Sequence, residues 1–152
     1  MNVNHKKFME LAFKEAEFGL KKNEVPIGAI VVYQNKIIGK GYNQTEILKD
    51  ATAHAEMIAI TSAFEFLNSS RLEDCVLYTT LEPCPMCAGA IVLSKISLLV
   101  FGAYDKKMGS VSSLYNITND TRLNHRLLCI GGVMEKESGS ILQEFFKGKR
   151  NV

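Results

Sequence analysis

Apolar and polar positions in the chain follow helical spacing in some segments and strand spacing in others. Near the N-terminus, apolar residues recur at steps of three and four: Phe8, Leu11, Ala12, Ala16 and Leu20. This spacing predicts an amphipathic helix over residues 5–21. Two β-branched runs follow, at 27–33 and 37–42, with a short polar turn between them. They predict a hairpin of two strands.

Helical and strand-like segments alternate through the rest of the chain. Thr52 is a residue type that caps helices, which predicts a second helix from there to residue 67. Further strands are predicted at 75–80, 98–101 and 127–133, and further helices at 84–94, after Pro83, and at 135–146. With no repeat or linker to divide it, this order predicts one domain over residues 1–152. The expected fold is α/β, a three-layer α/β/α arrangement around a mixed five-stranded sheet.

Composition narrows the class of protein. The chain is 47% hydrophobic and 22% charged, which excludes disordered, collagen-like and coiled-coil classes. Its net charge of +2 permits a nucleic-acid partner without requiring one. The apolar stretch 86–103 is interrupted by Ser94, Lys95 and Ser97, so no membrane span is expected. A polar N-terminus without a signal-peptide pattern, and only four cysteines, indicate a cytoplasmic protein.

Residues with zinc-ligand chemistry fall at two expected helix starts. His54 begins the second helix, while Cys84 and Cys87 begin the third. Cysteines three apart project from one helical face, and the positive helix end favours their thiolates. One histidine and two cysteines leave the fourth tetrahedral position open, as in catalytic zinc sites. The sequence therefore predicts one Zn²⁺ in each chain.

Glu56 follows His54 by two positions, which on a regular helix places it about 200° away. Both can serve one ion only if the first turn points end-on at the metal, with Glu56 outside the ligand set. There it could take a proton from zinc-bound water, whose pKa the metal lowers from ~15.7 to ~7, and pass it to substrate.

A Cys-x-x-Cys pair by itself is more often a structural zinc half-site or a redox pair. A closed zinc site would need a fourth ligand, and the candidates are Cys75, Cys129, His5 and His125. Cys75 and Cys129 lie in apolar strand patterns, where cysteine is usually a small buried hydrophobe. The presence of both halves of the pattern, at two helix starts, favours catalysis.

The pattern His-Ala-Glu, 26 residues, then Pro-Cys-x-x-Cys resembles the zinc-dependent cytidine/deoxycytidylate deaminase superfamily. Four longer blocks resemble the bacterial tRNA-specific adenosine deaminases: 24–29, 52–56, 81–90 and 124–126. The resemblance implies a cytidine deaminase-like fold and a homodimer. It also implies hydrolytic conversion of the wobble adenosine of an arginine tRNA to inosine, by a zinc-activated hydroxide that attacks C6.

The same resemblance implies roles for individual residues. His54, Cys84 and Cys87 would hold zinc, and Glu56 would shuttle protons. Five further positions match residues on the substrate side, at the tRNA anticodon stem-loop: Asn43, Asp105, Lys107, Asn124 and Phe146. Each also has a structural interpretation, such as a turn cap, a solvated loop charge or partial burial in the core.

Two other functions remain open from the sequence. One is a free nucleobase deaminase for guanine or cytosine, which would use identical zinc chemistry. The basic tail, Lys147, Lys149 and Arg150, disfavours it, because a free base offers no phosphate to bind. The other is a zinc-stabilised RNA-binding module without catalysis, which would have no need for Glu56.

Overall fold

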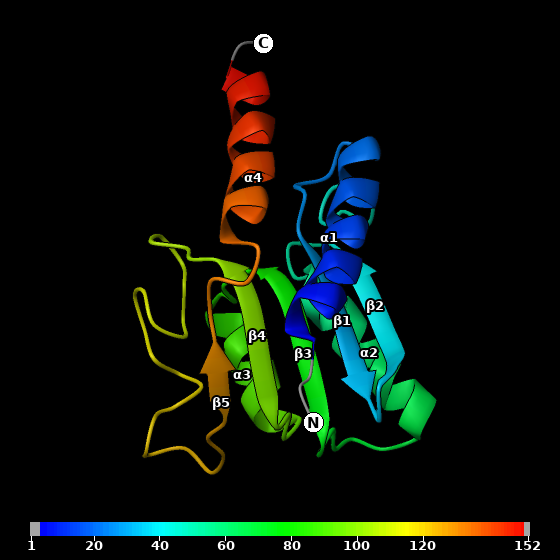
Figure 1. Ribbon diagram of the computed structural model, residues 1–152, viewed down its shortest axis with the longest axis vertical. Coiled ribbons are helices and arrows are strands. Elements are labelled where there is room, and N and C mark those ends of the chain that lie inside the picture. The colour runs from blue at the N-terminus through cyan, green and yellow to red at the C-terminus, as the bar shows by residue number, and fades with distance from the viewer. Residues whose placement is uncertain (1–3, 151–152) are drawn as a thin grey trace.

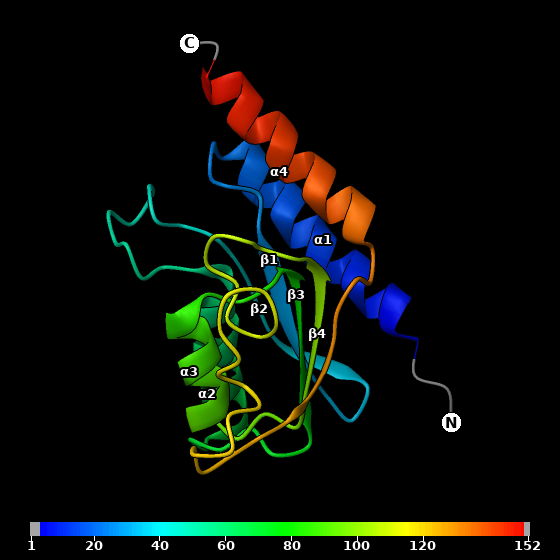
Figure 2. The ribbon, with the colours of Figure 1, turned by 90° about the vertical axis from the view of Figure 1, so that its left-hand side faces the viewer.

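The computed structural model describes residues 4–150, which form a five-stranded sheet between two pairs of helices (Figures 1 and 2). The elements are α1 (His5–Lys21), β1 (Gly28–Tyr33), β2 (Lys36–Tyr42), α2 (Ala55–Leu67), β3 (Cys75–Leu81), α3 (Pro85–Leu93), β4 (Leu98–Ala103), β5 (Leu128–Ile130) and α4 (Glu135–Arg150). In Figure 2, α2 and α3 cover one face of the sheet, and α1 and α4 cover the other. The expected α/β/α fold with a mixed sheet is confirmed.

Alternation along the strands builds a core on each face of the sheet. Ala29 and Val31 of β1 pack with α2 and α3, whereas Ile30 and Val32 pack with α1. The same period of two sends Tyr78 of β3 toward α1. Because both faces are covered, β1, β3 and β4 are nearly continuous apolar runs.

The strand order β2-β1-β3-β4-β5 brings several chain segments to one edge of the sheet. Strands β3, β4 and β5 are parallel, so β3 and β4 both end at this edge. Strand β1 is antiparallel to β2 and to β3. It therefore begins at the edge where β2 and β3 end. The ends of β2, β3 and β4 and the start of β1 thus lie together at the top of the sheet in Figure 1, and this side, which is not an edge strand, is called the upper edge below.

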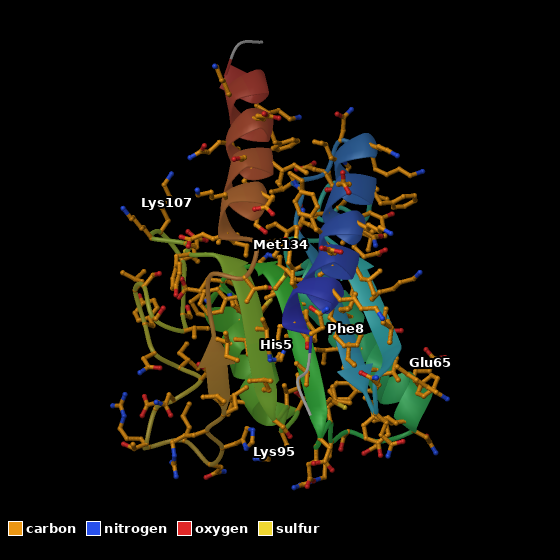
Figure 3. All side chains as sticks on the ribbon, in the orientation of Figure 1. His5, Phe8, Glu65, Lys95, Lys107 and Met134 are labelled. Carbon is orange, nitrogen blue, oxygen red and sulfur yellow. The ribbon has the colours of Figure 1, made fainter. Side chains whose placement is uncertain are left out.

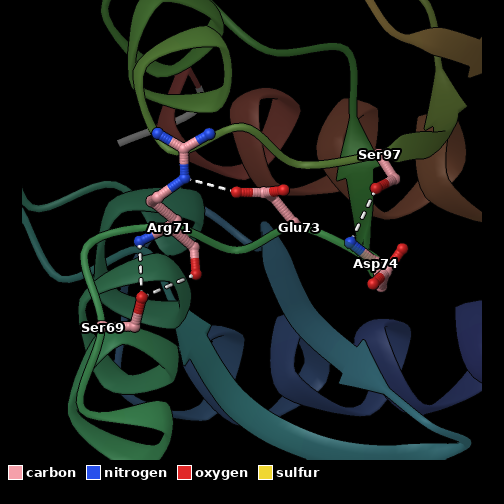
Figure 4. Close-up of polar contacts among 5 residues, drawn as sticks. All are labelled: Ser69, Arg71, Glu73, Asp74 and Ser97. Carbon is pink, nitrogen blue, oxygen red and sulfur yellow. Dashed lines mark hydrogen bonds and ion pairs between the residues drawn. The ribbon is translucent and has the colours of Figure 1, made fainter.

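The opposite edge is closed by contacts among loops (Figure 4). The Ser97 hydroxyl accepts a 2.8 Å hydrogen bond from the Asp74 N–H, which joins the turns that precede β4 and β3. Arg71 pairs with Glu73, and the Ser69 hydroxyl bonds to the backbone of Arg71. These polar groups satisfy one another and hold the loops at the starts of β3 and β4.

Most element boundaries lie within two residues of the sequence prediction, and the differences at α2, β5 and α4 have physical reasons or change the picture. The N-cap of α2 is His54, not Thr52, because the Thr52 hydroxyl instead donates to Asp50. Strand β5 keeps only Leu128–Ile130 of the expected 127–133. Helix α4 continues to Arg150, beyond the expected end at 146; residues 147–150 include no proline, and the single Gly148 does not end the helix. Within residues 4–150, none of the helices combines the length and apolarity that a membrane span requires.

Gly39 marks a close approach of α2 to the sheet and gives a test of the packing. A Cβ added there would lie 2.3 Å from the Ala59 carbonyl oxygen, which is backbone and cannot move aside. Gly39→Ala should therefore destabilise the protein by about 1–3 kcal/mol, measured by thermal or urea unfolding. Gly148 in α4 is the matched control, because it is exposed and an added Cβ meets nothing within 4 Å. Gly148→Ala should be neutral or stabilising; equal unfolding midpoints for the two variants would contradict this packing.

Candidate metal centre and active-site pocket

The N-termini of α2 and α3 meet at the upper edge and bring three potential metal ligands together. His54 and Cys84 are the N-caps of the two helices, both with extended backbone, and neither side chain caps its own helix. Their side chains are therefore free to point across the gap between the helices. Cys87 lies one turn into α3 and is fully buried.

The donor atoms are spaced as a tetrahedral ion requires. His54 Nδ1 lies 3.5 Å from Cys84 Sγ and 3.6 Å from Cys87 Sγ. Zinc with Zn–N of about 2.0–2.1 Å and Zn–S of about 2.3 Å needs nitrogen and sulfur about 3.5 Å apart. Two thiols and one imidazole are also a donor set that zinc prefers. The residues present therefore fit a zinc ion.

The three groups also influence one another's protonation. Hydrogen bonding from Cys87, followed by that from His54, lowers the pKa of the Cys84 thiol to about 4. Hydrogen bonding with Cys84 raises the pKa of His54 in turn. The same thiol contact and burial raise the pKa of Cys87. A lowered pKa favours the thiolate form of Cys84, which is the form in which cysteine binds zinc.

A pocket of about 460 Å³ opens over this cluster, and Glu56 lies in its wall. The lining comes from both helix starts and from loops at the upper edge: Ile27, Ala51, His54, Glu56, Leu81, Glu82, Cys84, Pro85, Met86, Asp105 and Met108. Glu56 is only 5% exposed, and burial raises its pKa to about 7. A carboxyl group with that pKa can both accept and donate a proton near neutral pH.

Comparison with known proteins identifies the family. The family model of MafB19-like deaminases matches residues 3–150. A tRNA-specific adenosine deaminase of Aquifex aeolicus (strain VF5) is 49% identical over 144 residues, which cover 95% of each chain. This chain belongs to the family of tRNA-specific adenosine deaminases.

Solved structures agree with this assignment to the deaminase family. One, from a study of A-to-I editing by tRNA:A34 deaminases at the wobble position of transfer RNA, superposes with a TM-score of 0.86. It is 43% identical and covers 90% of this chain and 99% of its own. A guanine deaminase from Bacillus subtilis superposes less well, with a TM-score of 0.64 and 38% identity, over 67% of this chain and 66% of its own.

Two of the five expected substrate-side residues lie at or beside this deaminase pocket. Asp105 follows β4 and lines the pocket, and its carboxylate accepts the N–H groups of Lys107 and Met108. Asn43 is buried just after β2, and its backbone N–H donates to the carbonyl of Ile27, which lines the pocket. Its side-chain amide donates to Thr45.

The other three lie away from the pocket lining within one chain. Lys107 shares the Asp105 turn, but its side chain projects from the surface (Figure 3). Phe146 is 46% exposed on α4 and packs edge-on against Phe145. Asn124 lies near the opposite edge, because the next residue, His125, hydrogen-bonds with the carbonyl of Ile96 before β4.

Sequence reasoning missed two carboxylates that are almost fully buried: Glu82, which lines the pocket, and Glu24, which precedes β1. Glu24 accepts the N–H groups of Glu46 and Ile47. Burial acts to raise the pKa of Glu82, but hydrogen bonds from Ser112 and other loop residues outweigh it, and the pKa is lowered. The position of Glu82 in the sequence could have singled it out, since it directly follows an apolar strand and precedes the Pro83-Cys84 pair.

The ligand set can be tested by comparing two cysteines of the same chain. Cys84→Ala should lose bound zinc, because two remaining donors chelate far more weakly than three. Cys75→Ala should keep one zinc per chain, since burial in β3 raises the pKa of Cys75 to about 11 and it stays a neutral thiol in the core. Zinc per chain is measured by mass spectrometry after dialysis against a chelator. Retention of zinc by Cys84→Ala would contradict the site.

Proposed function

We propose that the protein hydrolyses the wobble adenosine of a tRNA anticodon to inosine. The observation that carries the proposal is the juxtaposition of a zinc-compatible His-Cys-Cys cluster with the buried Glu56 in one pocket, within a chain 49% identical to a tRNA-specific adenosine deaminase. Hydrolysis replaces the amino group at C6 of adenine with oxygen and releases ammonia. A flipped base can enter such a pocket from a single-stranded loop at lower cost than from a duplex.

His54, Cys84 and Cys87 would hold the metal, one ion per chain. When bound, zinc supplies Lewis acidity that makes water a nucleophile at neutral pH. Glu56, buried beside the ligands, would take a proton from the attacking water and deliver it to the leaving amine. Its raised pKa suits this role, because the same carboxyl group must accept and then donate.

The remaining residues would contact the tRNA around the flipped base. Asp105 and Asn43 would border the base, while Lys107 and Phe146 would lie further out, along the anticodon arm. Helix α4 projects beyond the upper edge of the sheet (Figure 1), and it carries Phe146 and the basic residues Lys147 and Lys149. A surface that extends past the pocket can contact a polynucleotide, whereas a free base in the pocket would not reach it.

A homodimer would complete the site. Phe66 of α2 and Leu93 of α3 are 64% and 79% exposed, and burial of such side chains favours association. Asn124 lies far from the pocket of its own chain, so it would act on tRNA only at the pocket of a second copy.

An arginine tRNA is the proposed substrate, and the cytoplasm the proposed location. The domain would span residues 1–152, of which 1–3 and 151–152 lie outside the described residues.

The proposed activity is tested with unfractionated tRNA and with free nucleobases. The zinc-loaded protein should form inosine in tRNA, detected after nuclease digestion by mass spectrometry. Glu56→Gln should lower the rate by at least about 100-fold, because the amide cannot accept the proton. It should keep one zinc per chain, since Glu56 is not among the ligands.

The free-base alternative makes the opposite prediction in the same assay. Ammonia released from guanine or cytosine, without inosine in tRNA, would contradict the proposed function. Normal turnover by a zinc-loaded Glu56→Gln variant would contradict the role of Glu56 but not the proposed identity of the substrate.

The tail of α4 can be tested through the salt dependence of tRNA binding. Lys147 and Lys149 are exposed, and the Lys149 ammonium lies 5.4 Å from the ring centroid of Phe145. If both contact phosphates, replacing them with Gln should weaken binding and flatten the slope of log affinity against log salt by about 1.5. The matched control is Lys36→Gln with Lys95→Gln, the same charge change at the opposite edge. Identical slopes for the two double variants would show that the tail is not a phosphate contact.

A further inference from the structure

The carboxylate of Glu82 makes five hydrogen bonds, all with the loop that follows β4. Oε1 accepts the N–H of Asp105 at 3.1 Å and also the hydroxyl of Ser113. Oε2 accepts three successive N–H groups, those of Val111, Ser112 and Ser113, at 3.1, 2.8 and 3.0 Å. Glu82 is 1% exposed, so these donors take the place of water around its charge.

Within the described residues, no cationic side chain forms an ion pair with Glu82. The ion pairs found there join Lys49 with Glu46, Arg71 with Glu73, and Arg122 with Asp120, and none involves Glu82. The charge of Glu82 is therefore compensated by the peptide groups of the loop itself. The loop and the buried carboxylate depend on each other: loss of the loop would leave the charge of Glu82 without donors, and loss of the carboxylate would leave the N–H of the buried Val111 unpaired.

Two further contacts fix the loop, residues 105–113, against the segment before Cys84. The N–H of Ser110 donates to the carbonyl of Pro83 at 2.8 Å. Gly109 packs so tightly on Glu82 that an added Cβ would lie 2.5 Å from the carboxyl carbon. At its other end, Glu82 is held by its own N–H, which donates to the Ala103 carbonyl at the end of β4.

The loop held in this way forms one wall of the pocket. Asp105 and Met108 line the same pocket as His54 and Cys84, and the Asp105 carboxylate fixes the turn that carries Met108. The metal ligands lie at the starts of α2 and α3, and the bond from the Ser110 N–H to the carbonyl of Pro83, next to Cys84, does not involve the Glu82 carboxylate. Loosening the loop should thus disturb substrate binding more than metal binding.

We propose that Glu82 is a positioning residue: it holds the 105–113 loop as the substrate-binding wall of the pocket. This inference rests on the proposed function for the identity of the substrate. The metal ligands would then carry the chemistry. The loop held by the Glu82 carboxylate would shape the binding of the flipped nucleotide.

Glu82→Gln is the informative variant because it keeps size and removes charge. Whichever way the amide is turned, its NH₂ group faces backbone N–H donors, either Asp105 or the three of residues 111–113. One side of the carboxylate's hydrogen bonding is therefore lost. With an anticodon stem-loop carrying the wobble adenosine, we expect KM to rise at least tenfold, kcat to change less than threefold, and zinc to stay at one per chain.

Limited trypsin digestion gives a readout that needs no substrate. Lys106 and Lys107 are exposed within the loop, and cleavage there requires the loop to open locally. Glu82→Gln should speed cleavage after these lysines at least tenfold. The matched control is Glu24→Gln, an equally buried carboxylate that binds a different loop. It should speed cleavage after the exposed Lys49 and leave Lys106 and Lys107 at the wild-type rate.

Ser113→Ala serves if Glu82→Gln fails to fold, because it keeps the charge and removes only one donor. It should raise both KM and the cleavage rate at Lys106 and Lys107 by a smaller factor, about two- to fivefold. Unchanged cleavage with unchanged KM in these variants would overturn the proposal, as would loss of zinc with an intact loop. Failure of the wild type to form inosine would contradict the proposed function instead, while the digestion would still decide whether Glu82 holds the loop.

Discussion

The parallel pairing of β3 with β4 requires the chain to return along one face of the sheet, and α3 is that return. Because the crossover starts at the upper edge, the N-terminus of α3 lies there, next to that of α2. The facing helix starts bring Cys84 within 3.5 Å of His54, although 30 positions separate them in the chain. The metal cluster is thus a consequence of sheet topology, and the positive helix ends favour the thiolate it needs.

Two buried glutamates at this edge, Glu56 and Glu82, show how surroundings decide the protonation of one residue type. Glu56 has burial as the dominant influence, and its pKa rises to about 7. Glu82 is buried as well, yet hydrogen bonds from its loop lower its pKa. A carboxylate supplied with donors stays charged and structural, whereas one left with few donors can exchange a proton.

The sequence predicted those parts of the molecule that local patterns determine. Spacing was enough for α1, for the hairpin and for the mixed sheet, and residue chemistry singled out His54, Cys84 and Cys87, which the structure brings together. It could not show that Thr52 would bond to Asp50 and leave His54 as the N-cap. The position of the N-cap depends on the turn at residues 50–52, which the spacing of apolar residues does not reveal.

The role of Glu82 was also beyond local patterns, because its five donors lie 23 to 31 residues further along the chain. Long-range backbone contacts of this kind leave no periodic trace in a sequence. They also explain how one fold can serve several substrates. A guanine deaminase shares this fold with a TM-score of 0.64. When metal ligands rest on helix starts and the substrate wall on a separately held loop, the loop can change while the chemistry stays the same.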